Sequence, residues 1–480
     1  MNQTMLQAFE YTCPDDGNHF DYLQEQAEML RDAGITSLWL PPVFKGSSER
    51  DTGYSTYDLY DLGEFDQKGT IRTKYGTKEQ LHALIEHLHG LGMKVYADVV
   101  LNHKASGDEE ETFLAQPVQQ DNRLENAGEE REITAWTKFT FPGRGDTYSS
   151  FKWNHHHFTG VDYDSATGEE GVFLIKGENK GWETGVAPEK GNFDYLMFCD
   201  VHLSHPEVRE ELFHWAQWFI EETGVDGFRF DALKHISDDF IHDLVNHIKS
   251  FREDFYFFGE YWVSDGDQTE DYLYQTKYKT DLFDVNLHYH LQQASLHHDY
   301  DMRTIFDNTL VQAYPQMAVT FVDNHDSQPG EALESFVEPD FKKIAYALIL
   351  LRRDGYPCVF FGDYFGLGEP RPMEPKKDLI DNLLYLRKTF AYGDQEDYFH
   401  EPHLIGWVRQ GEEHHPEKLA VIISTKEGGS IRMSVGPEEA GKVYRDYTGS
   451  IQDTITIDDE GYGDFMVGDR DVSCWAVEGK

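Results

Sequence analysis

Four segments of the sequence place acidic side chains directly after short apolar runs. The segments are Asp98–His103, Gly227–His235, Phe258–Trp262 and Phe321–Asp326. Three of them carry the carboxyl groups of Asp231, Glu260 and Asp326. Cleavage of a glycosidic bond needs two carboxyl groups with different tasks, one as nucleophile or charge stabiliser and one as a protonated acid. The segments therefore indicate a site that cleaves bonds between sugars, provided that the fold brings them together.

The neighbours of the first two carboxyl groups predict which of them stays ionised. Arg229 lies two residues before Asp231, so both side chains point to the same face of a strand. A guanidinium so close favours the charged form of a carboxyl group. Glu260 is followed by Tyr261 and Trp262, which can exclude water and keep the acid protonated near neutral pH. We expect Asp231 to be the ionised group and Glu260 to be the acid.

The apolar runs that carry these groups belong to a longer series of predicted strands. The candidates are Met5–Phe9, Ile35–Leu40, Lys94–Val100, Gly224–Phe230, Phe255–Glu260, Asp281–Asn286, Ala318–Val322 and Cys358–Phe361. Amphipathic helices lie between them, with apolar residues at helical spacing in 207–222 and in 339–352, where Pro339 is expected near the first turn. This alternation predicts an α/β fold, a closed (β/α)8 TIM barrel, in which chemistry lies at the carboxyl ends of the strands.

Two stretches of the chain depart from the alternation. Residues 104–206 are rich in Gly, Asp, Glu and aromatic residues and lack a long amphipathic period, which predicts a long β-rich insertion after strand 3. After residue 392, short strand-like segments separated by glycine predict an all-β C-terminal domain. We therefore predict a barrel domain from 1–103 and 207–392, an inserted domain at 104–206, and a C-terminal β-sandwich at 393–480.

The polar segments resemble the signature blocks of the α-amylase family in their order and spacing. Further similarity lies in Gly53–Phe65 and Asn192–Met197, and the resemblance covers nearly the whole chain. It is strongest to the intracellular bacterial α-amylases and the liquefying α-amylases of bacilli. The resemblance implies endo-acting, retaining hydrolysis of internal α-1,4 bonds in starch, glycogen or maltodextrins. It makes Asp231 the nucleophile, Glu260 the acid and base, and Asp326 the residue that holds the distorted sugar.

The resemblance also assigns residues that contact the substrate. Those beside the cleaved sugar would be Tyr54, His103, Arg229 and His325, and those beyond the cleaved bond would be Lys234, His235 and Trp262. A few positions depart from the family pattern, namely Phe230, Leu233, Gly259 and Ser327. These departures concern packing and leave the catalytic groups in place.

Oxygen donors at the two ends of the insertion resemble the structural calcium site of the family. Asn102, Asp194 and Asp200 would bind the ion, together with the backbone carbonyl of His235. Hard oxygen ligands of this kind suit calcium and not zinc. One calcium ion, the expected cofactor, would thus fasten the insertion beside the active site.

A second cation site is predicted less directly. Asp162 and Glu183 would contribute to it, as acidic residues do in the liquefying relatives, but His202 stands where those relatives carry an aspartate. The run His155–His157 cannot direct three consecutive side chains to one ion in a strand, so we assign it to a loop.

The charge of the chain restricts its partners. A formal net charge of −46 disfavours nucleic acid and anionic membranes, whereas a neutral polyol is compatible with it. The chain has no apolar run long enough to span a membrane and no leader-like N-terminus, and its four cysteines lie far apart. These features favour a cytoplasmic location. Together with the resemblance to the α-amylase family, they lead us to expect a monomer that acts on an α-glucan polysaccharide or maltooligosaccharide.

Two alternatives share most of these features. An α-glucan transglycosylase or a maltooligosaccharide-forming enzyme of the same family would carry the same catalytic blocks. Cyclodextrin-forming enzymes resemble the family but carry extra domains, so the short C-terminal part disfavours them. A catalytically inactive relative that serves as a binding subunit would lose carboxylates, and all three are present here.

Overall fold

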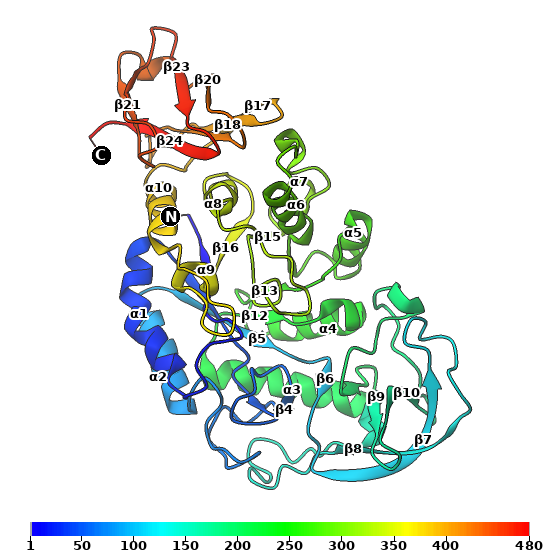
Figure 1. Cartoon of the computed structure of the whole chain (residues 1–480). Helices are drawn as coiled ribbons and strands as arrows, with labels where there is room; N and C mark the ends of the chain where they lie inside the picture. Colours follow the sequence, from blue (N-terminus) through cyan, green and yellow to red (C-terminus); the bar gives the residue numbers. More distant parts are fainter. Residues whose placement is uncertain (1, 480) are drawn as a thin grey trace.

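A closed ring of parallel strands forms the centre of the molecule (Figure 1). This computed structural model describes residues 2–479, so Met1 and Lys480, which end the predicted domain ranges, lie outside the described residues. In ring order the strands are β1 (Met5–Gln7), β16 (Tyr356–Phe360), β15 (Ala318–Phe321), β14 (Asp281–Phe283), β13 (Tyr256–Gly259), β12 (Gly227–Phe230), β5 (Lys94–Val99) and β2 (Ser37–Leu40). The prediction of a closed eight-stranded barrel is confirmed.

Helices surround the barrel. Their bounds are α1 His19–Ala33, α2 Lys78–Gly90, α3 Pro206–Thr223, α4 Asp238–Lys249, α5 Gly266–Gln275, α6 Val285–Leu296, α7 Leu310–Ala313, α8 Lys342–Leu350, α9 Phe361–Phe365 and α10 Lys377–Thr389. Helix α3 buries Val208, Leu212, Trp215 and Phe219, as its periodicity predicted. Apolar residues at this spacing form one stripe that packs on the barrel.

Several predicted element ends differ from the structure by one to three residues, and one of them has a clear local cause. The strand expected at Asp281–Asn286 ends at Phe283, because the side chain of Asp284 accepts a hydrogen bond from the Leu287 amide (3.0 Å) and caps α6. Helix α8 begins at Lys342, so Pro339 precedes the helix instead of lying in its first turn. Both errors concern element ends, and neither changes the order of strands around the barrel.

The insertion between β5 and α3 folds into its own sheet. Its strands pair in the order β6 (His103–Lys104), β11 (Cys199–Val201), β9 (Phe158–Asp164), β10 (Glu169–Ile175), β7 (Glu109–Val118) and β8 (Arg131–Lys138). The run His155–His157 forms a single 3₁₀ turn before β9. The insertion is therefore β-rich, as the sequence predicted.

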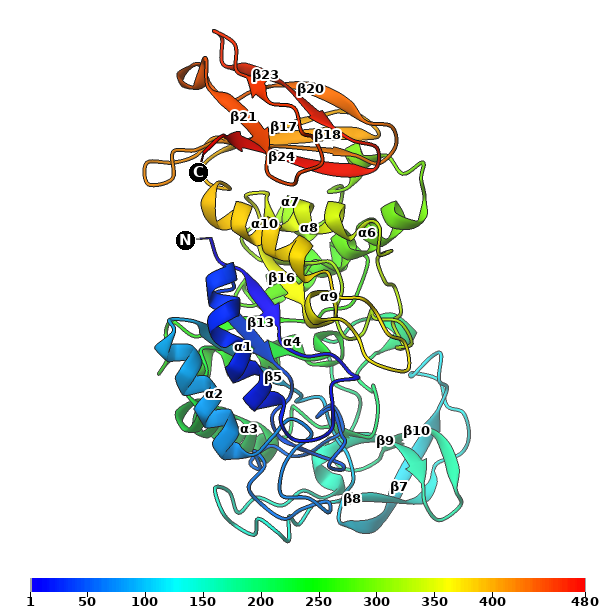
Figure 2. The same ribbon diagram turned by 60° about the vertical axis from the view of Figure 1, so that its left-hand side comes forward.

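The C-terminal part is built from two packed sheets. The larger has the order β17 (Gln395–Glu401), β18 (Leu404–Arg409), β19 (Leu419–Ser424), β24 (Asp471–Val477), β21 (Val443–Asp446) and β22 (Ile455–Thr456), and the smaller pairs β20 (Gly429–Ser434) with β23 (Tyr462–Val467). Met433 and Phe465 of the smaller sheet share a core with Val408 and Trp475 of the larger. Figures 1 and 2 place these sheets and the insertion at opposite ends of the barrel.

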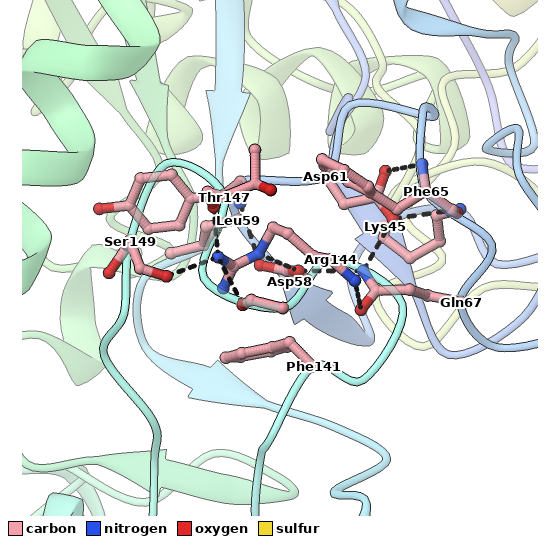
Figure 3. Close-up of polar contacts among 12 residues, drawn as sticks. Lys45, Asp58, Leu59, Asp61, Phe65, Gln67, Phe141, Arg144, Thr147 and Ser149 are labelled. Carbon is pink, nitrogen blue, oxygen red and sulfur yellow. Dashed lines mark hydrogen bonds and ion pairs between the residues drawn. The ribbon is translucent and has the colours of Figure 1, made fainter.

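A buried ionic network joins the insertion to the segment that follows β2 (Figure 3). Arg144 of the insertion bonds to Asp58 (Nε to Oδ2, 2.7 Å), and Lys45 lies 3.3 Å from Asp61. The Gln67 amide bridges the two acids at 3.0 and 2.9 Å. We call these five residues the Arg144 network; each of its two acids faces a cation supplied by the protein itself.

Two further features bear on the predictions from composition. None of the helices in residues 2–479 has the length and apolarity needed to cross a membrane. Cys13, Cys199, Cys358 and Cys474 are all buried and unpaired in the described chain.

Candidate active site

The Arg229 guanidinium is the centre of the polar group at the carboxyl end of the barrel. Its Nη1 donates to Asp231 Oδ1 (2.7 Å) and to Asp98 Oδ1 (2.9 Å), and its Nη2 donates to Glu260 Oε2 (2.5 Å). Arg229 itself is fully buried. Strand β12 lies between β5 and β13 in the barrel, so one side chain of β12 reaches acids from both neighbours. Three carboxyl groups therefore share a single cation.

Asp98 is a member of this group that the sequence did not single out. It lies directly opposite Arg229 in the register of β5 and β12. Its Oδ2 accepts hydrogen bonds from the Tyr54 hydroxyl (2.8 Å) and from Trp39 Nε1 (3.1 Å). Burial raises the pKa of Asp98 to about 7, although Arg229 opposes the shift. Asp98 thus fixes both the guanidinium and Tyr54, and knowledge of the strand register would have revealed it.

Glu260 follows β13 and has the environment of a proton donor. Burial raises the pKa of Glu260 to about 8, the nearby carboxylates add to the shift, and Arg229 counteracts it. The side chain stays 12% exposed, compared with 11% for Asp231 and 21% for Asp326. Each of the three acids therefore presents an edge that a bound molecule can reach.

Asp326 is held by a hydrogen bond at one of its oxygens. The Tyr11 hydroxyl donates to Oδ1 (3.0 Å), and His325 Nε2 lies 3.2 Å from Oδ2 without a hydrogen bond. Burial raises the pKa of Asp326, with Arg229 acting against the shift. Tyr11 comes from the loop after β1, and no sequence pattern predicted its contact with Asp326, which lies 315 positions away along the chain.

The loop that carries Asp326 is braced from behind by a second buried ion group. Ser327 Oγ donates to Asp323 Oδ1 (2.8 Å), and the ammonium of Lys342 contacts Asp323 and Asp363. Asn324 Oδ1 accepts from the Asp326 amide at 3.0 Å. Lys342, Asp323 and Asp363 are fully buried or nearly so. The hydroxyl of Ser327 keeps this contact, so the departure at this position is explained.

The aromatic and histidine residues predicted beside the cleaved sugar lie together. The rings of Tyr54 and His325 stack with centroids 5.2 Å apart and planes 10° apart. His103 Nε2 bonds to the Tyr54 carbonyl (2.8 Å), and Gln7 Nε2 contacts His325 Nδ1 (2.9 Å). Burial lowers the pKa of His103 and of His325, so both imidazoles are neutral near pH 7. They can bind hydroxyl groups without adding charge.

The three residues predicted beyond the cleaved bond, Lys234, His235 and Trp262, contact different parts of the protein. Lys234 Nζ contacts Glu189 Oε2 and the Trp262 carbonyl, both at 3.2 Å. Trp262 Nε1 donates to the Tyr289 hydroxyl (2.9 Å). The imidazole of His235 is buried and bonds to the Phe193 carbonyl (2.6 Å), so it faces the insertion.

Two of the departures from the family pattern compensate for each other. A Cβ atom added at Gly259 would lie 2.4 Å from Leu233 Cδ1 and 3.0 Å from the Phe230 carbonyl. The larger side chain at position 233 therefore occupies the space that a missing methyl group leaves at position 259. The Phe230 ring stacks on Phe257 with centroids 5.8 Å apart. Phe230, Leu233 and Gly259 therefore pack against one another at the ends of β12 and β13.

The predicted calcium ligands converge at the base of the insertion. Asn102 Nδ2 lies 3.3 Å from Asp200 Oδ1, and Asp194 Oδ2 accepts from the Glu183 amide (2.8 Å). Burial raises the pKa of Asp194 to about 8 and also raises that of Asp200, which Asp194 reinforces. No Lys or Arg side chain of residues 2–479 forms an ion pair with either aspartate. Two buried acids that lack a protein cation fit a bound calcium ion.

The residues predicted for a second cation do not form a comparable group. Asp162 accepts from the Phe198 amide (2.8 Å), and Glu183 accepts from the Ser204 amide (2.8 Å). His202 Nε2 lies 3.8 Å from Glu183 Oε1, where a further acid would be needed. Of the three consecutive histidines, only His157 joins a set of possible metal ligands, with His205 and Glu207.

A closed parallel barrel whose strand ends bring together Asp231, Glu260 and Asp326 defines a glycoside hydrolase of the barrel class. The family description "Alpha amylase, catalytic domain" matches residues 8–169 and 191–401, and "Alpha-amylase C-terminal" matches residues 428–476. The chain belongs to the α-amylase family and hydrolyses α-1,4-glucans.

Particular relatives match over almost the full chain. It is 48% identical to the glucan 1,4-alpha-maltohexaosidase of Bacillus sp. (strain 707), over 99% of this chain and 92% of that protein. It is 40% identical to the cytoplasmic alpha-amylase of Escherichia coli (strain K12), over 99% of each. A solved cyclomaltodextrin glucanotransferase with three domains matches in fold, with a TM-score of 0.66 at 19% identity, over 100% of this chain and 99% of that one. Chain length therefore does not separate hydrolases from cyclodextrin-forming enzymes.

Proposed function

We propose that the protein is an endo-acting, retaining α-amylase in which Asp231 is the nucleophile, Glu260 the acid and base, and Asp326 the residue that holds the distorted sugar. The supporting observation is that one guanidinium contacts both Asp231 and Glu260, while burial raises the pKa of Glu260 to about 8. At neutral pH Glu260 is therefore a protonated acid beside the Asp231 side chain that Arg229 contacts, as the reaction requires.

The reaction proceeds in two displacements at the same carbon. Glu260 gives its proton to the glycosidic oxygen while an Asp231 oxygen bonds to C1 and the leaving chain departs as an alcohol. Glu260, now a carboxylate, takes a proton from water, and the water oxygen attacks C1 and releases Asp231. Both acids return to their first state. Each displacement inverts C1, so the product keeps the α-configuration.

The neighbouring residues supply binding. Tyr54 offers a ring face to the sugar, and neutral His103 and His325 offer hydrogen bonds to its hydroxyl groups. Lys234 and Trp262 are proposed to contact the glucan beyond the cleaved bond. The side chain of His235 faces the insertion, so we assign to this residue its backbone carbonyl as a calcium ligand.

One calcium ion is proposed to bind Asn102, Asp194, Asp200 and the His235 carbonyl. Its contribution is structural, because it would neutralise two buried acids and join the insertion to the barrel. A second cation at Asp162 and Glu183 stays a prediction. We also propose that the domain boundaries follow the ranges 1–103 with 207–392, 104–206 and 393–480, and that the enzyme works as a cytoplasmic monomer.

A narrower activity is favoured by one relative, because the Bacillus sp. protein is named a maltohexaosidase and is 48% identical. A time course of products from amylose distinguishes the two. Random internal cleavage gives a broad mixture early in the reaction, whereas a maltooligosaccharide-forming enzyme gives one dominant length from the start. Cyclic products would instead support a glucanotransferase.

The mechanism is tested by the configuration of the first product. Proton NMR of a fresh digest should show the α-anomer before mutarotation, whereas the early appearance of the β-anomer would remove Asp231 as nucleophile. Asp231→Asn, Glu260→Gln and Asp326→Asn should each lower kcat by about 10³-fold or more with an unchanged circular dichroism spectrum.

A further inference from the structure

A second hollow lies beside the active site, between the loop after β1 and helix α9. It has a volume of about 450 Å³. One wall is aromatic, with Tyr22 of α1 against Phe361 and Phe365 of α9 at centroid distances of 6.3 and 5.7 Å. The hollow is lined by neither Lys nor Arg. We call it the Tyr22 pocket.

Two polar groups of the Tyr22 pocket, the Tyr22 hydroxyl and His19 Nδ1, form no hydrogen bond with the described residues. The Asn18 side chain contacts the Asp16 carboxylate at the rim, and His19 Nε2 contacts the Ala8 carbonyl (2.8 Å). Burial lowers the pKa of His19 to about 4, so its Nδ1 is a neutral acceptor. The carboxylate of Glu10 is already occupied by Thr12 and Gln328. The free groups are therefore neutral donors and acceptors.

A single loop separates this pocket from the catalytic acids. Tyr11 points to the active site and donates to Asp326, while its neighbours Glu10 and Thr12 line the pocket. Gln328, two residues after Asp326, lies 3.4 Å from Glu10. The pocket and the active site therefore lie at the same end of the barrel, on opposite sides of one loop.

The chemistry of the walls selects the class of ligand. Aromatic faces stack on the apolar faces of sugar rings, and neutral hydroxyl, amide and imidazole groups bind sugar hydroxyls. The acids Glu10 and Asp16 and the lack of lining cations disfavour phosphate or carboxylate ligands. The volume falls within the range of small-molecule sites.

We propose that the Tyr22 pocket is a second binding site for the α-glucan, which holds a short segment of a long chain while another part is cleaved. The proposal rests on the activity proposed above. A chain anchored there raises the local concentration of cleavable bonds at the catalytic acids. The site should therefore lower KM for long substrates and leave KM for short ones unchanged.

The test compares a long and a short substrate. In the Tyr22→Ala/Phe365→Ala variant, KM for glycogen should rise by about two- to tenfold, because one or two contacts between an aromatic ring and the glucan are lost. Its kcat on glycogen and both constants on a chromogenic maltotrioside should stay unchanged. Asn18→Ala, which alters only the polar rim, should shift KM for glycogen in the same direction. The matched control is Tyr163→Ala, because Tyr163 is 42% exposed on the insertion, outside the pocket.

A binding measurement covers the case in which the double variant folds poorly. Calorimetric titration of Glu260→Gln protein with maltoheptaose should give two sites, and Asn18→Ala or Tyr22→Ala in that background should weaken one of them. One site in every variant, or an unchanged KM for glycogen, overturns the pocket proposal. Absence of activity on amylose and glycogen in the unaltered protein would instead overturn the proposed function.

Discussion

Two of the places where the insertion meets the barrel domain balance buried acids in opposite ways. In the Arg144 network, Asp58 and Asp61 each face a cation, Arg144 and Lys45, inside the protein. At the predicted calcium site, Asp194 and Asp200 are equally buried and have no such partner among residues 2–479. The first attachment is complete as soon as the chain folds, whereas the second depends on an ion from solution.

One attachment should therefore stabilise the fold in any solution, whereas the other should stabilise it only when the ion is bound. Loss of one partner from a buried ion pair leaves an uncompensated charge, so the Arg144 network should respond to mutation and not to solution conditions. The calcium site should respond to both. The acids around Arg229 are an intermediate case, because Asp98, Asp231 and Glu260 share this residue as their single cation.

The largest effect is expected from Arg144→Met. The change leaves Asp58 buried beside Gln67 without its cation, which should lower the free energy of unfolding by about 3–5 kcal/mol even with saturating calcium. Thermal and urea unfolding measure the loss. The control is Arg131→Met, which removes an exposed pair with Glu169 in the same insertion and should cost about 0.5 kcal/mol or less. Equal stability of the two variants would contradict the comparison.

Removal of calcium is expected to have the next largest effect. An ion present at 100- to 1,000-fold excess over its Kd stabilises the folded state by about 2.7–4.1 kcal/mol, so chelation should lower Tm and activity together. Asn102→Ala should reproduce part of the loss. Chelation and Arg144→Met should add within about 0.5 kcal/mol if the two attachments are independent. An ion-free protein with unchanged Tm and activity would remove the calcium site.

The pH dependence of activity tests the third arrangement, in which several buried acids share Arg229. Glu260 has a raised pKa of about 8, so its acid form is present below that pH and is lost above it. We expect kcat/KM to fall about tenfold for each unit of pH on the alkaline side. For the same reason the contribution of this group to stability declines as pH rises from its unfolded pKa of about 4.5 towards 8. A flat profile to pH 10, with circular dichroism unchanged, would contradict the assignment of Glu260 as acid.

Salt should have the smallest effect. With a net charge of −46 the folded chain repels itself, and the screening length falls from about 10 Å at 0.1 M to about 3 Å at 1 M salt. We expect Tm to rise by several degrees between millimolar and molar potassium chloride, and more in the calcium-free protein. Buried pairs are screened little, so Arg144→Met should gain no more than the unaltered chain. A flat profile would leave the charge as a solubility feature.

The sequence predicted what depends on neighbours along the chain. The barrel strands follow from apolar runs, and the contact of Arg229 with Asp231 follows from their spacing within one strand. The contact of Tyr11 with Asp326 joins residues 315 positions apart, and no local pattern signals it. Asp98 was visible as a strand-end acid, but its role depends on the register between β5 and β12.

The same limit explains why only one of the two attachments was predicted from the sequence. The calcium ligands were predicted because the resemblance to the α-amylase family implied them. The Arg144 network was not, because Arg144 and Asp58 lie in loops whose contact depends on how the insertion packs. Long-range packing of irregular segments is set by the whole fold and leaves little trace in the spacing of residues.

The contact between positions 233 and 259 also couples these two positions. A methyl group at 259 would lie 2.4 Å from Leu233 Cδ1 and 3.0 Å from the Phe230 carbonyl, so the Leu233 side chain would have to move. The effects of Gly259→Ala and Leu233→Ala on stability should therefore not add, because the smaller residue at 233 removes the close approach that alanine at 259 creates.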